Sequence, residues 1–242
     1  MRYIFVSPHL DDIALSCGGI VNLLHSNGID VEIWTIFAGS PKSKILTPFA
    51  NSLHKRWNLP LDAPKMRRLE DKVACNILGA KYQHFNYPDC IYRYDSQNQP
   101  LINCEDDLYQ NIPIFQNYLV DEISGLIRSQ ISEQDVIISP LAIGNHIDHQ
   151  IVVNTIKKLN LKNLLFYEDY PYVIKTSKEK KLYQKLIPQS YHLTKSNMSK
   201  WHESIAAYTS QISTFWISVE RMKEEVLRFF NEGGGTNLWH HL

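Results

Sequence analysis

Residues 3–12 read Tyr-Ile-Phe-Val-Ser-Pro-His-Leu-Asp-Asp, a short apolar run that leads directly into a proline, an imidazole and two carboxylates. The apolar run predicts a buried β-strand that ends at Ser7-Pro8. Residues 18–27 then carry apolar side chains at helical spacing up to Gly28, and residues 31–37 (VEIWTIF) predict a second strand. Strand, loop, helix and strand within about 35 residues are typical of a βαβ unit.

The same alternation continues along the chain. It predicts helices over 64–78, 119–127 and 151–159 and strands over 82–86, 136–139 and 164–167. This order favours the α/β class, as a three-layer α/β/α sandwich with a Rossmann-like, mainly parallel sheet. We expect two late helices, at about 196–211 and 214–230, to pack back on the sheet.

The chain reads as one domain over residues 1–242. The long stretches 41–61 and 87–112 contain Pro, Asn and Asp and are expected to line the site rather than to add strands. Three consecutive glycines at 233–235 predict that residues 231–242 form a flexible tail.

Lysine plus arginine equals aspartate plus glutamate at 25 each, so no overall charge favours nucleic acid or an anionic membrane. No apolar run is long enough to predict a membrane span or a signal peptide, and we expect a cytoplasmic protein. The four cysteines form no C-x-x-C pair, which argues against a disulfide framework. The partner is therefore expected to be a small molecule, and a homo-oligomer is left open.

Two polar clusters follow predicted strands that are far apart in sequence. His9, Asp11 and Asp12 follow the first strand, and His146 and His149 lie beyond the strand at 136–139. Ligand sites in parallel α/β sheets form at the carboxyl ends of strands, so we expect the clusters to meet there. Each residue alone would more often be a structural histidine or a helix cap, and only the pairing of the clusters favours a site.

Imidazoles and carboxylates are good zinc ligands, and a catalytic zinc needs three protein ligands plus one position for water. The clusters supply enough groups for a metal site with a further base and acid, as metal-assisted amide hydrolysis requires. Spacing alone does not decide which imidazoles bind the metal. No G-x-G-x-x-G follows the first strand, which disfavours a dinucleotide cofactor.

These motifs resemble those of a known enzyme family. Pro8-His9-Leu10-Asp11-Asp12 followed by Gly18-Gly19 is similar to the P-H-P-D-D-E...G-G signature of the PIG-L/LmbE-like zinc N-deacetylases, and residues 146–149 (HIDH) are similar to their H-P-D-H motif. Residues 67–70 (RRLE) resemble the family's R-x-x-E helix, and residues 200–211 resemble its K...SQ helix. The resemblance extends from Tyr3 to about Gln211.

The resemblance implies a set of roles for the site residues. Asp11 would be the general base for the metal-bound water, His146 the electrophile or acid, and Asp148 a carboxylate that orients His146. Arg67 and Asp89 would contact the sugar. The Zn²⁺ ligands would be His9, Asp12 and His149, although another divalent metal is possible.

The chain departs from the family pattern at a few positions. Leu10 and Ile147 replace the usual prolines, Ile13 stands where an acidic residue is common, and residues 37–39 (FAG) stand where Thr-Asp-Gly is frequent. None of these changes removes a ligand, although they affect the surroundings of the substrate.

The expected function is removal of an N-acetyl group from an N-acetylglucosamine-type amino sugar or its conjugate. Two alternatives stay open: an amidase for a non-sugar or thiol-sugar acyl amine, and a non-catalytic sugar-binding module of the same fold.

Overall fold

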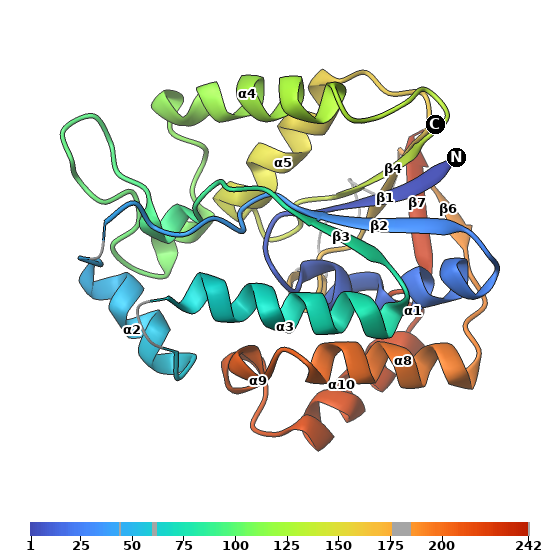
Figure 1. Cartoon of the computed structure of the whole chain (residues 1–242). Coiled ribbons are helices and arrows are strands. Elements are labelled where there is room, and N and C mark those ends of the chain that lie inside the picture. The colour runs from blue at the N-terminus through green and yellow to red at the C-terminus, as the bar shows by residue number, and fades with distance from the viewer. Residues whose placement is uncertain (44, 60–61, 176–184, 242) are drawn as a thin grey trace.

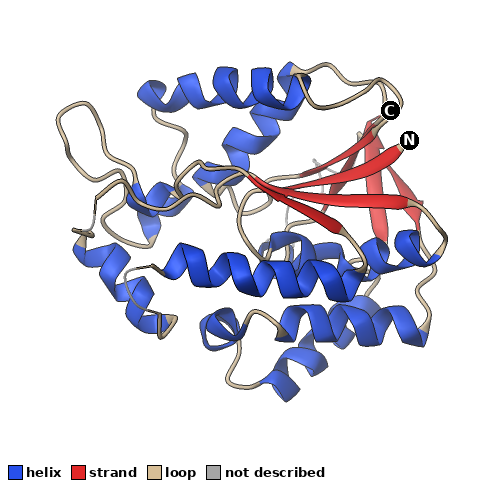
Figure 2. Ribbon diagram, viewed as in Figure 1, coloured by secondary structure: helices blue, strands red, loops and turns tan. Residues whose placement is uncertain are grey.

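The computed structural model describes residues 1–43, 45–59, 62–175 and 185–241, and its centre is a mixed sheet of seven strands (Figures 1 and 2). The strand order is β3-β2-β1-β4-β5-β7-β6. The first five strands of this order are parallel, and β7 is antiparallel to both of its neighbours. The strands are β1 (Arg2–Ser7), β2 (Asp30–Thr35), β3 (Lys81–His84), β4 (Val136–Pro140), β5 (Leu164–Tyr167), β6 (Leu186–Ser190) and β7 (Asn237–His241).

Helices cover both faces of this sheet, which confirms the predicted three-layer α/β sandwich. In Figure 1, α4 and α5 lie on one face and α1 and α3 on the other. The helices are α1 (Asp12–Ser26), α2 (Pro48–Arg56), α3 (Ala63–Leu78), α4 (Asn117–Arg128), α5 (Ile147–Lys158), α6 (Tyr172–Lys175), α8 (Lys195–Ala206), α9 (Thr209–Phe215) and α10 (Val219–Asn231), with 3₁₀ turns η1 (Cys90–Tyr92), η2 (Asp106–Tyr109) and η3 (Ile114–Gln116).

The alternation of side chains along β1 explains why both faces are covered. Ile4 and Val6 belong to the core beneath α4 and α5, whereas Phe5 belongs to the core beneath α1 and α3. All three side chains are fully buried. Because successive side chains of a strand point to opposite faces, an uninterrupted apolar strand needs a helical layer on each side.

The late helices differ from the prediction in number and in position. Three helices, α8, α9 and α10, replace the expected two, because the helix expected at 196–211 ends at Ala206 and a separate helix, α9, starts at Thr209. Helix α8 packs against α1 and α3 and not directly on the sheet, so it belongs to an additional outer layer (Figure 1). Trp201 fills this layer and is fully buried.

The prediction of a flexible tail at 231–242 is wrong for the residues that the structure describes. Residues 237–241 form β7, which lies between β5 and β6 inside the sheet. Leu238 is fully buried in the core beneath α1 and α3. The glycines at 233–235 therefore form the turn between α10 and this strand.

The two long excursions carry residues to the sheet's carboxyl edge. Residues 41–61 contain α2, and residues 87–112 contain η1 and η2. Isolated bridges between Phe37 and Asn86 and between Gly39 and Pro88 hold the starts of the two excursions together. Within the described residues, no helix combines the length and the apolar character that crossing a membrane requires.

Candidate active site and metal centre

The two polar clusters meet at the carboxyl ends of β1 and β4, which are adjacent parallel strands. His9 lies in the loop after β1, and His149 lies in the first turn of α5, which follows β4. The imidazole centroids of His9 and His149 are 5.4 Å apart, and that of His146 is 4.9 Å from His9 and 5.2 Å from His149. The predicted convergence of the clusters is therefore confirmed.

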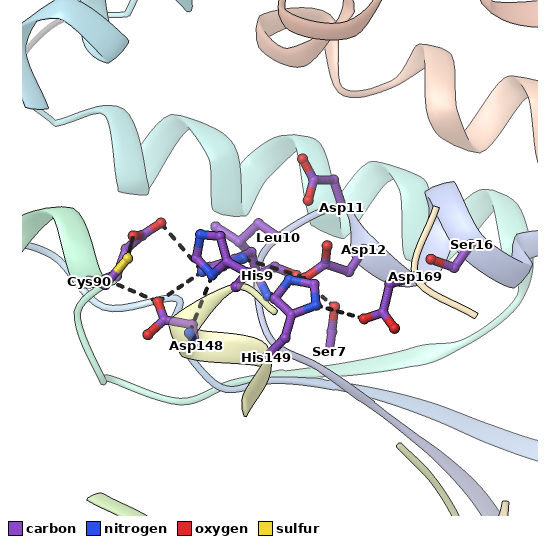
Figure 3. Close-up of polar contacts among 12 residues, drawn as sticks. Ser7, His9, Leu10, Asp11, Asp12, Ser16, Cys90, Asp148, His149 and Asp169 are labelled. Atoms are coloured by element: carbon purple, nitrogen blue, oxygen red, sulfur yellow. Dashed lines mark hydrogen bonds and ion pairs between the residues drawn. The ribbon is translucent and has the colours of Figure 1, made fainter. Parts of the chain in front are cut away.

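Asp12 lies between the imidazole of His9 and that of His149 (Figure 3). Its Oδ2 is 3.6 Å from Nδ1 of His9 and 3.5 Å from Nε2 of His149. The Nε2 atom of His149 is buried and has no hydrogen-bond partner among the described residues. A buried ring nitrogen is costly to leave unsatisfied, whereas a bound metal ion would use it as a ligand.

A carboxylate holds the other nitrogen of each imidazole. His149 Nδ1 is 2.7 Å from Oδ1 of Asp169, and His9 Nε2 is 2.9 Å from Oδ2 of Asp148. Such carboxylate–imidazole pairs fix the ring orientation of metal-binding histidines and raise their basicity. Both histidines thus have one nitrogen held by a carboxylate and the other facing Asp12.

The position of Asp148 differs from the expectation that it orients His146. Its carboxylate accepts hydrogen bonds from the Cys90 backbone N–H and the Arg93 guanidinium and contacts His9. Only its backbone N–H reaches His146, by donating to Nδ1 at 3.3 Å. The Asp148 side chain is therefore held by residues 90–93 and by His9 of the loop after β1, and not by His146 of its own helix.

More carboxylates than guanidinium groups gather at the site. Burial opposes the ionisation of Asp12, but His149 and His9 outweigh it and hold the pKa of Asp12 below its usual range. A divalent cation bound at Asp12 would add positive charge among these carboxylates. The carboxylates are those of Asp11, Asp12, Asp89, Asp148 and Asp169, and the guanidinium groups are those of Arg67 and Arg93.

Asp11 has an unusual backbone conformation at the N-cap of α1. Its φ is 125°, a region that side-chain-bearing residues rarely adopt, and its side chain is directed toward α3 (Figure 3). Arg67 of α3 donates to the Leu10 carbonyl at 2.7 Å and to Asp11 Oδ2 at 3.2 Å, which fixes both backbone and side chain. Burial raises the pKa of Asp11 to about 7, against the opposing charge of Arg67.

His146 is the N-cap of α5 and accepts the Asp148 N–H at Nδ1. Burial, together with His9 and His149, lowers the pKa of His146 well below its usual value. A neutral imidazole that accepts at Nδ1 carries its proton on Nε2. The nitrogens of His146 also lie close enough to those of His9 and His149 for all three to share one ion, so distance alone leaves this second ligand set open.

A cavity of about 140 Å³ reaches these groups from the surface. Asp11, Asp12 and His146 line its inner end, and Arg67 and Asp89, the expected sugar contacts, line it as well. Arg67 is 8% exposed and already paired with Asp11, whereas Asp89 Oδ1 accepts the Ile91 N–H and its Oδ2 is 3.7 Å from His9. Residues from both excursions complete the walls, as predicted.

The sequence analysis did not identify several residues of this site. Asp169 lies just beyond β5, and its position at the end of a predicted strand could have identified it as a site residue. Tyr109 and Tyr172 line the cavity with their rings nearly perpendicular to those of His146 and His149 respectively. Tyrosine is not a residue type that indicates a metal site, so the sequence did not single them out. Arg93 belongs to the site only through its contact with Asp148.

Comparisons with known proteins find relatives of this chain at the level of sequence and of structure. A family model described as PIG-L, GlcNAc-PI de-N-acetylase, matches residues 4–160. A 2'-N-acetylparomamine deacetylase of Niallia circulans is 28% identical over 187 residues, which cover 70% of this chain and 67% of that protein. The crystal structure of a deacetylase from the teicoplanin biosynthesis pathway is 26% identical with a TM-score of 0.84, covering 99% of this chain and 96% of that one. The zinc-inhibited form of a teicoplanin deacetylase is 26% identical with a TM-score of 0.83 and the same coverage.

Proposed function

The chain belongs to the PIG-L family and is a metal-dependent N-deacetylase, and we propose that it removes the acetyl group from an N-acetylated amino sugar carried on a larger conjugate. The observation that carries the proposal is the arrangement of Asp12 between two carboxylate-held imidazoles, beside a buried Asp11. The related enzymes named for 2'-N-acetylparomamine and for the teicoplanin pathway support an amino sugar within a conjugate as the substrate.

We assign the metal to His9 Nδ1, Asp12 Oδ2 and His149 Nε2. His149 Nε2 lacks any other partner, and the remaining nitrogen of each imidazole is held by a carboxylate. Two histidines and one aspartate favour Zn²⁺, and the zinc-inhibited form of a related deacetylase indicates that zinc binds to an enzyme of this kind. When bound, such an ion supplies Lewis-acid chemistry that polarises an amide carbonyl and acidifies water.

Asp11 is suited to act as the general base. With a pKa near 7 its carboxylate is ionised in a useful fraction at neutral pH and still binds a proton effectively. It accepts a proton from the attacking water, and that proton is then available to the departing amine. Arg67 keeps the carboxylate in place during both transfers through its bonds to Asp11 and Leu10.

His146 is suited to stabilise the negative charge that develops on the acetyl oxygen. Its Nε2–H is a donor, because the Asp148 N–H fixes the proton on that nitrogen. A fixed donor aimed at a developing oxyanion contributes more in the transition state than in the ground state. Arg67 and Asp89 line the same cavity and are proposed to contact the sugar.

The test uses purified enzyme loaded with Zn²⁺ and measures acetate released from N-acetylglucosamine and its conjugates. Asp11→Asn keeps the size of the side chain but cannot accept a proton, so kcat should fall by about 10²–10⁴ while metal content is unchanged. Asp121→Asn, at an exposed ion pair with Lys158, is the matched control and should behave as wild type. Wild-type turnover in Asp11→Asn would remove this residue from the reaction.

A further inference from the structure

A second cavity, of about 690 Å³, lies beside the catalytic cavity of about 140 Å³. The two share Ile91 of η1 and otherwise have different walls. The second cavity lies between residues 41–43 and 45–47, residues 86–94 and the start of α4. Its volume falls within the range of about 300–1,000 Å³ that is typical of small-molecule sites, and nothing in the proposed reaction uses it.

The walls of this second cavity combine aromatic rings with polar groups. The lining includes four tyrosines, Tyr87, Tyr92, Tyr94 and Tyr118, together with amide side chains such as that of Gln116. Tyrosine offers a flat apolar face and a hydroxyl group, and amides both donate and accept hydrogen bonds. A sugar ring presents apolar C–H faces and hydroxyl edges, so this set of side chains suits it.

The charges of the described lining residues favour a neutral ligand over an ionic one. The Arg93 guanidinium is bonded to the buried Asp148 carboxylate, and Glu122 accepts a hydrogen bond from the Tyr87 hydroxyl at 3.1 Å. Lys42 is the remaining charged side chain among the described lining residues. A phosphate or nucleotide would need several converging cations, whereas a neutral ligand needs none.

Gln116 provides a separate indication of a polar occupant. This residue is 2% exposed, and its Oε1 has no hydrogen-bond partner among the described residues. Buried amide oxygens are normally satisfied, and an unsatisfied one is destabilising. A hydroxyl group bound in the cavity could donate to this oxygen after a small side-chain rotation.

We propose that the second cavity is a binding site for a neutral carbohydrate unit. The unit has two sources, a further sugar of the same substrate conjugate or a free sugar that binds independently. In both cases the sugar unit contacts η1 and Arg93. The opposite side of η1 faces the catalytic cavity through Ile91, and Asp148, the partner of Arg93, holds His9.

Calorimetric titration of the metal-loaded enzyme with cellobiose tests the binding. Tyr118 is 56% exposed on α4, so its truncation should leave the fold intact. Tyr118→Ala should weaken binding at least tenfold, and Tyr94→Ala provides a second variant. Tyr82→Ala is the matched control, because Tyr82 is 39% exposed on β3 and does not line this cavity. Equal losses in all three variants, or no saturable binding by wild type, would overturn the proposal.

Two further titrations test where the ligand binds and to which chemical class it belongs. Saturating glucosamine, the expected type of product, should leave cellobiose binding unchanged; competition would place cellobiose in the catalytic cavity and refute the proposal. Benzyl alcohol should bind more weakly than cellobiose, because it lacks most of the hydroxyl groups. Tighter binding of benzyl alcohol would rule out a carbohydrate site.

Kinetics then distinguishes the two sources of the sugar. If the unit belongs to the substrate, Tyr118→Ala should raise KM for an N-acetylated disaccharide conjugate and leave KM for N-acetylglucosamine unchanged. If it is a free sugar, neither KM should change, and added cellobiose should alter kcat in wild type but not in Tyr118→Ala. Since the binding is read as heat, its failure is distinguishable from a failure of the deacetylase proposal.

Discussion

The two ring nitrogens of His149 face different carboxylates, and this arrangement suits the role of metal ligand that we propose for Nε2. Nδ1 faces Asp169 at 2.7 Å, which holds the proton on that side of the ring. In the neutral imidazole the lone pair is then on Nε2, which lies 3.5 Å from Oδ2 of Asp12 and would face a metal ion bound between them. The carboxylate of Asp169 thus selects the tautomer that a metal ligand requires.

We predict that Asp169→Asn weakens Zn²⁺ binding by about 10–100-fold, the usual effect of losing such a carboxylate partner. Competition with a chelator of known affinity measures the change. Asp121→Asn should retain wild-type affinity, since its carboxylate lies on the surface beside Lys158. Unchanged affinity in Asp169→Asn would show that Asp169 serves only the packing of the loop after β5.

The sequence revealed the residues whose chemistry is explicit and missed those whose role depends on a partner. His9, Asp11 and His146 belong to recognisable motifs, and the structure brings them together. Asp169 and Arg93 act through His149 and Asp148, and no local spacing announces such a contact. The carboxylate of Asp148 contacts Arg93 and His9 and not the expected His146, for the same reason: only the fold determines which side chain faces it.

At the scale of single elements, helix α1 shows that the first glycine of the Gly18-Gly19 motif is required for packing. Cys17 has non-helical angles (φ −152°, ψ 26°), so the helix is kinked just before Gly18. A Cβ on Gly18 would lie 2.8 Å from Cδ1 of Trp201, which explains the glycine. The Trp201 indole N–H donates to the Ala14 carbonyl at 2.6 Å, an inserted side chain of the kind that accompanies helix kinks.

Replacing this donor should destabilise the protein. We predict that Trp201→Phe lowers the free energy of unfolding by about 1–3 kcal/mol through the unpaired Ala14 carbonyl alone, with a further loss from the cavity left behind. Trp216→Phe is the matched control, because Trp216 is also buried and loses similar packing, whereas its N–H donates to Glu225, whose side chain is 33% exposed. The loss of that hydrogen bond alone should cost about 0.5–1.5 kcal/mol. Urea unfolding measures both, and equal losses would contradict the role assigned to the kink.

Local signals also explain which elements could be predicted. The helix with Pro64 in its first turn and Gly79 past its end was predicted closely, because Gly79 adopts φ 79° as a C-terminal cap requires. The division between α8 and α9 was missed. Glu70 of α3 accepts hydrogen bonds from the backbone N–H and the hydroxyl of Ser210, and this contact across the fold fixes the start of α9.

At the scale of the whole molecule, an ion pair fastens the N-terminal strand to the centre of the sheet. Arg2 donates to Asp135 through its backbone N–H and its guanidinium, with the shortest distance 2.6 Å. Asp135 also accepts the Ser132 N–H at 2.9 Å. Burial alone would raise the pKa of Asp135, but the bonds from Arg2 and Ser132 hold it well below its usual range.

This depressed pKa predicts a dependence of stability on pH. The ionised Asp135 carboxylate contributes to the free energy of unfolding. This contribution is complete above the unfolded-state pKa of about 4 and is lost as the pH falls toward the folded-state pKa. Between about pH 5 and pH 2, the free energy of unfolding should therefore fall by about 1–3 kcal/mol more for wild type than for Asp135→Asn. Urea titrations at stepped pH measure this difference, and parallel curves for the two proteins would refute it.

The C-terminal segment completes the same sheet from the other end of the chain. Strand β7 pairs with β6 over five residues, from Ser190 with Asn237 to Leu186 with His241, and with β5 at Phe166 and Trp239. The sequence could not reveal this, because a run of glycines is as suitable for a turn as for a flexible end. The pairing also depends on strands that are distant along the chain.

The two interpretations of this segment predict different effects of one substitution. Leu238 is fully buried, so Leu238→Ala should lower the free energy of unfolding by about 2–5 kcal/mol, as at other buried leucines. Leu227→Ala is the matched control on α10, where Leu227 is 44% exposed and its truncation should cost much less. A mobile tail would make the Leu238 change neutral in urea unfolding, whereas a central strand makes it the more damaging of the two. Because β7 separates β5 from β6, the loss of its buried side chain weakens the sheet on both sides, and we expect the transition to stay cooperative and to shift as a whole.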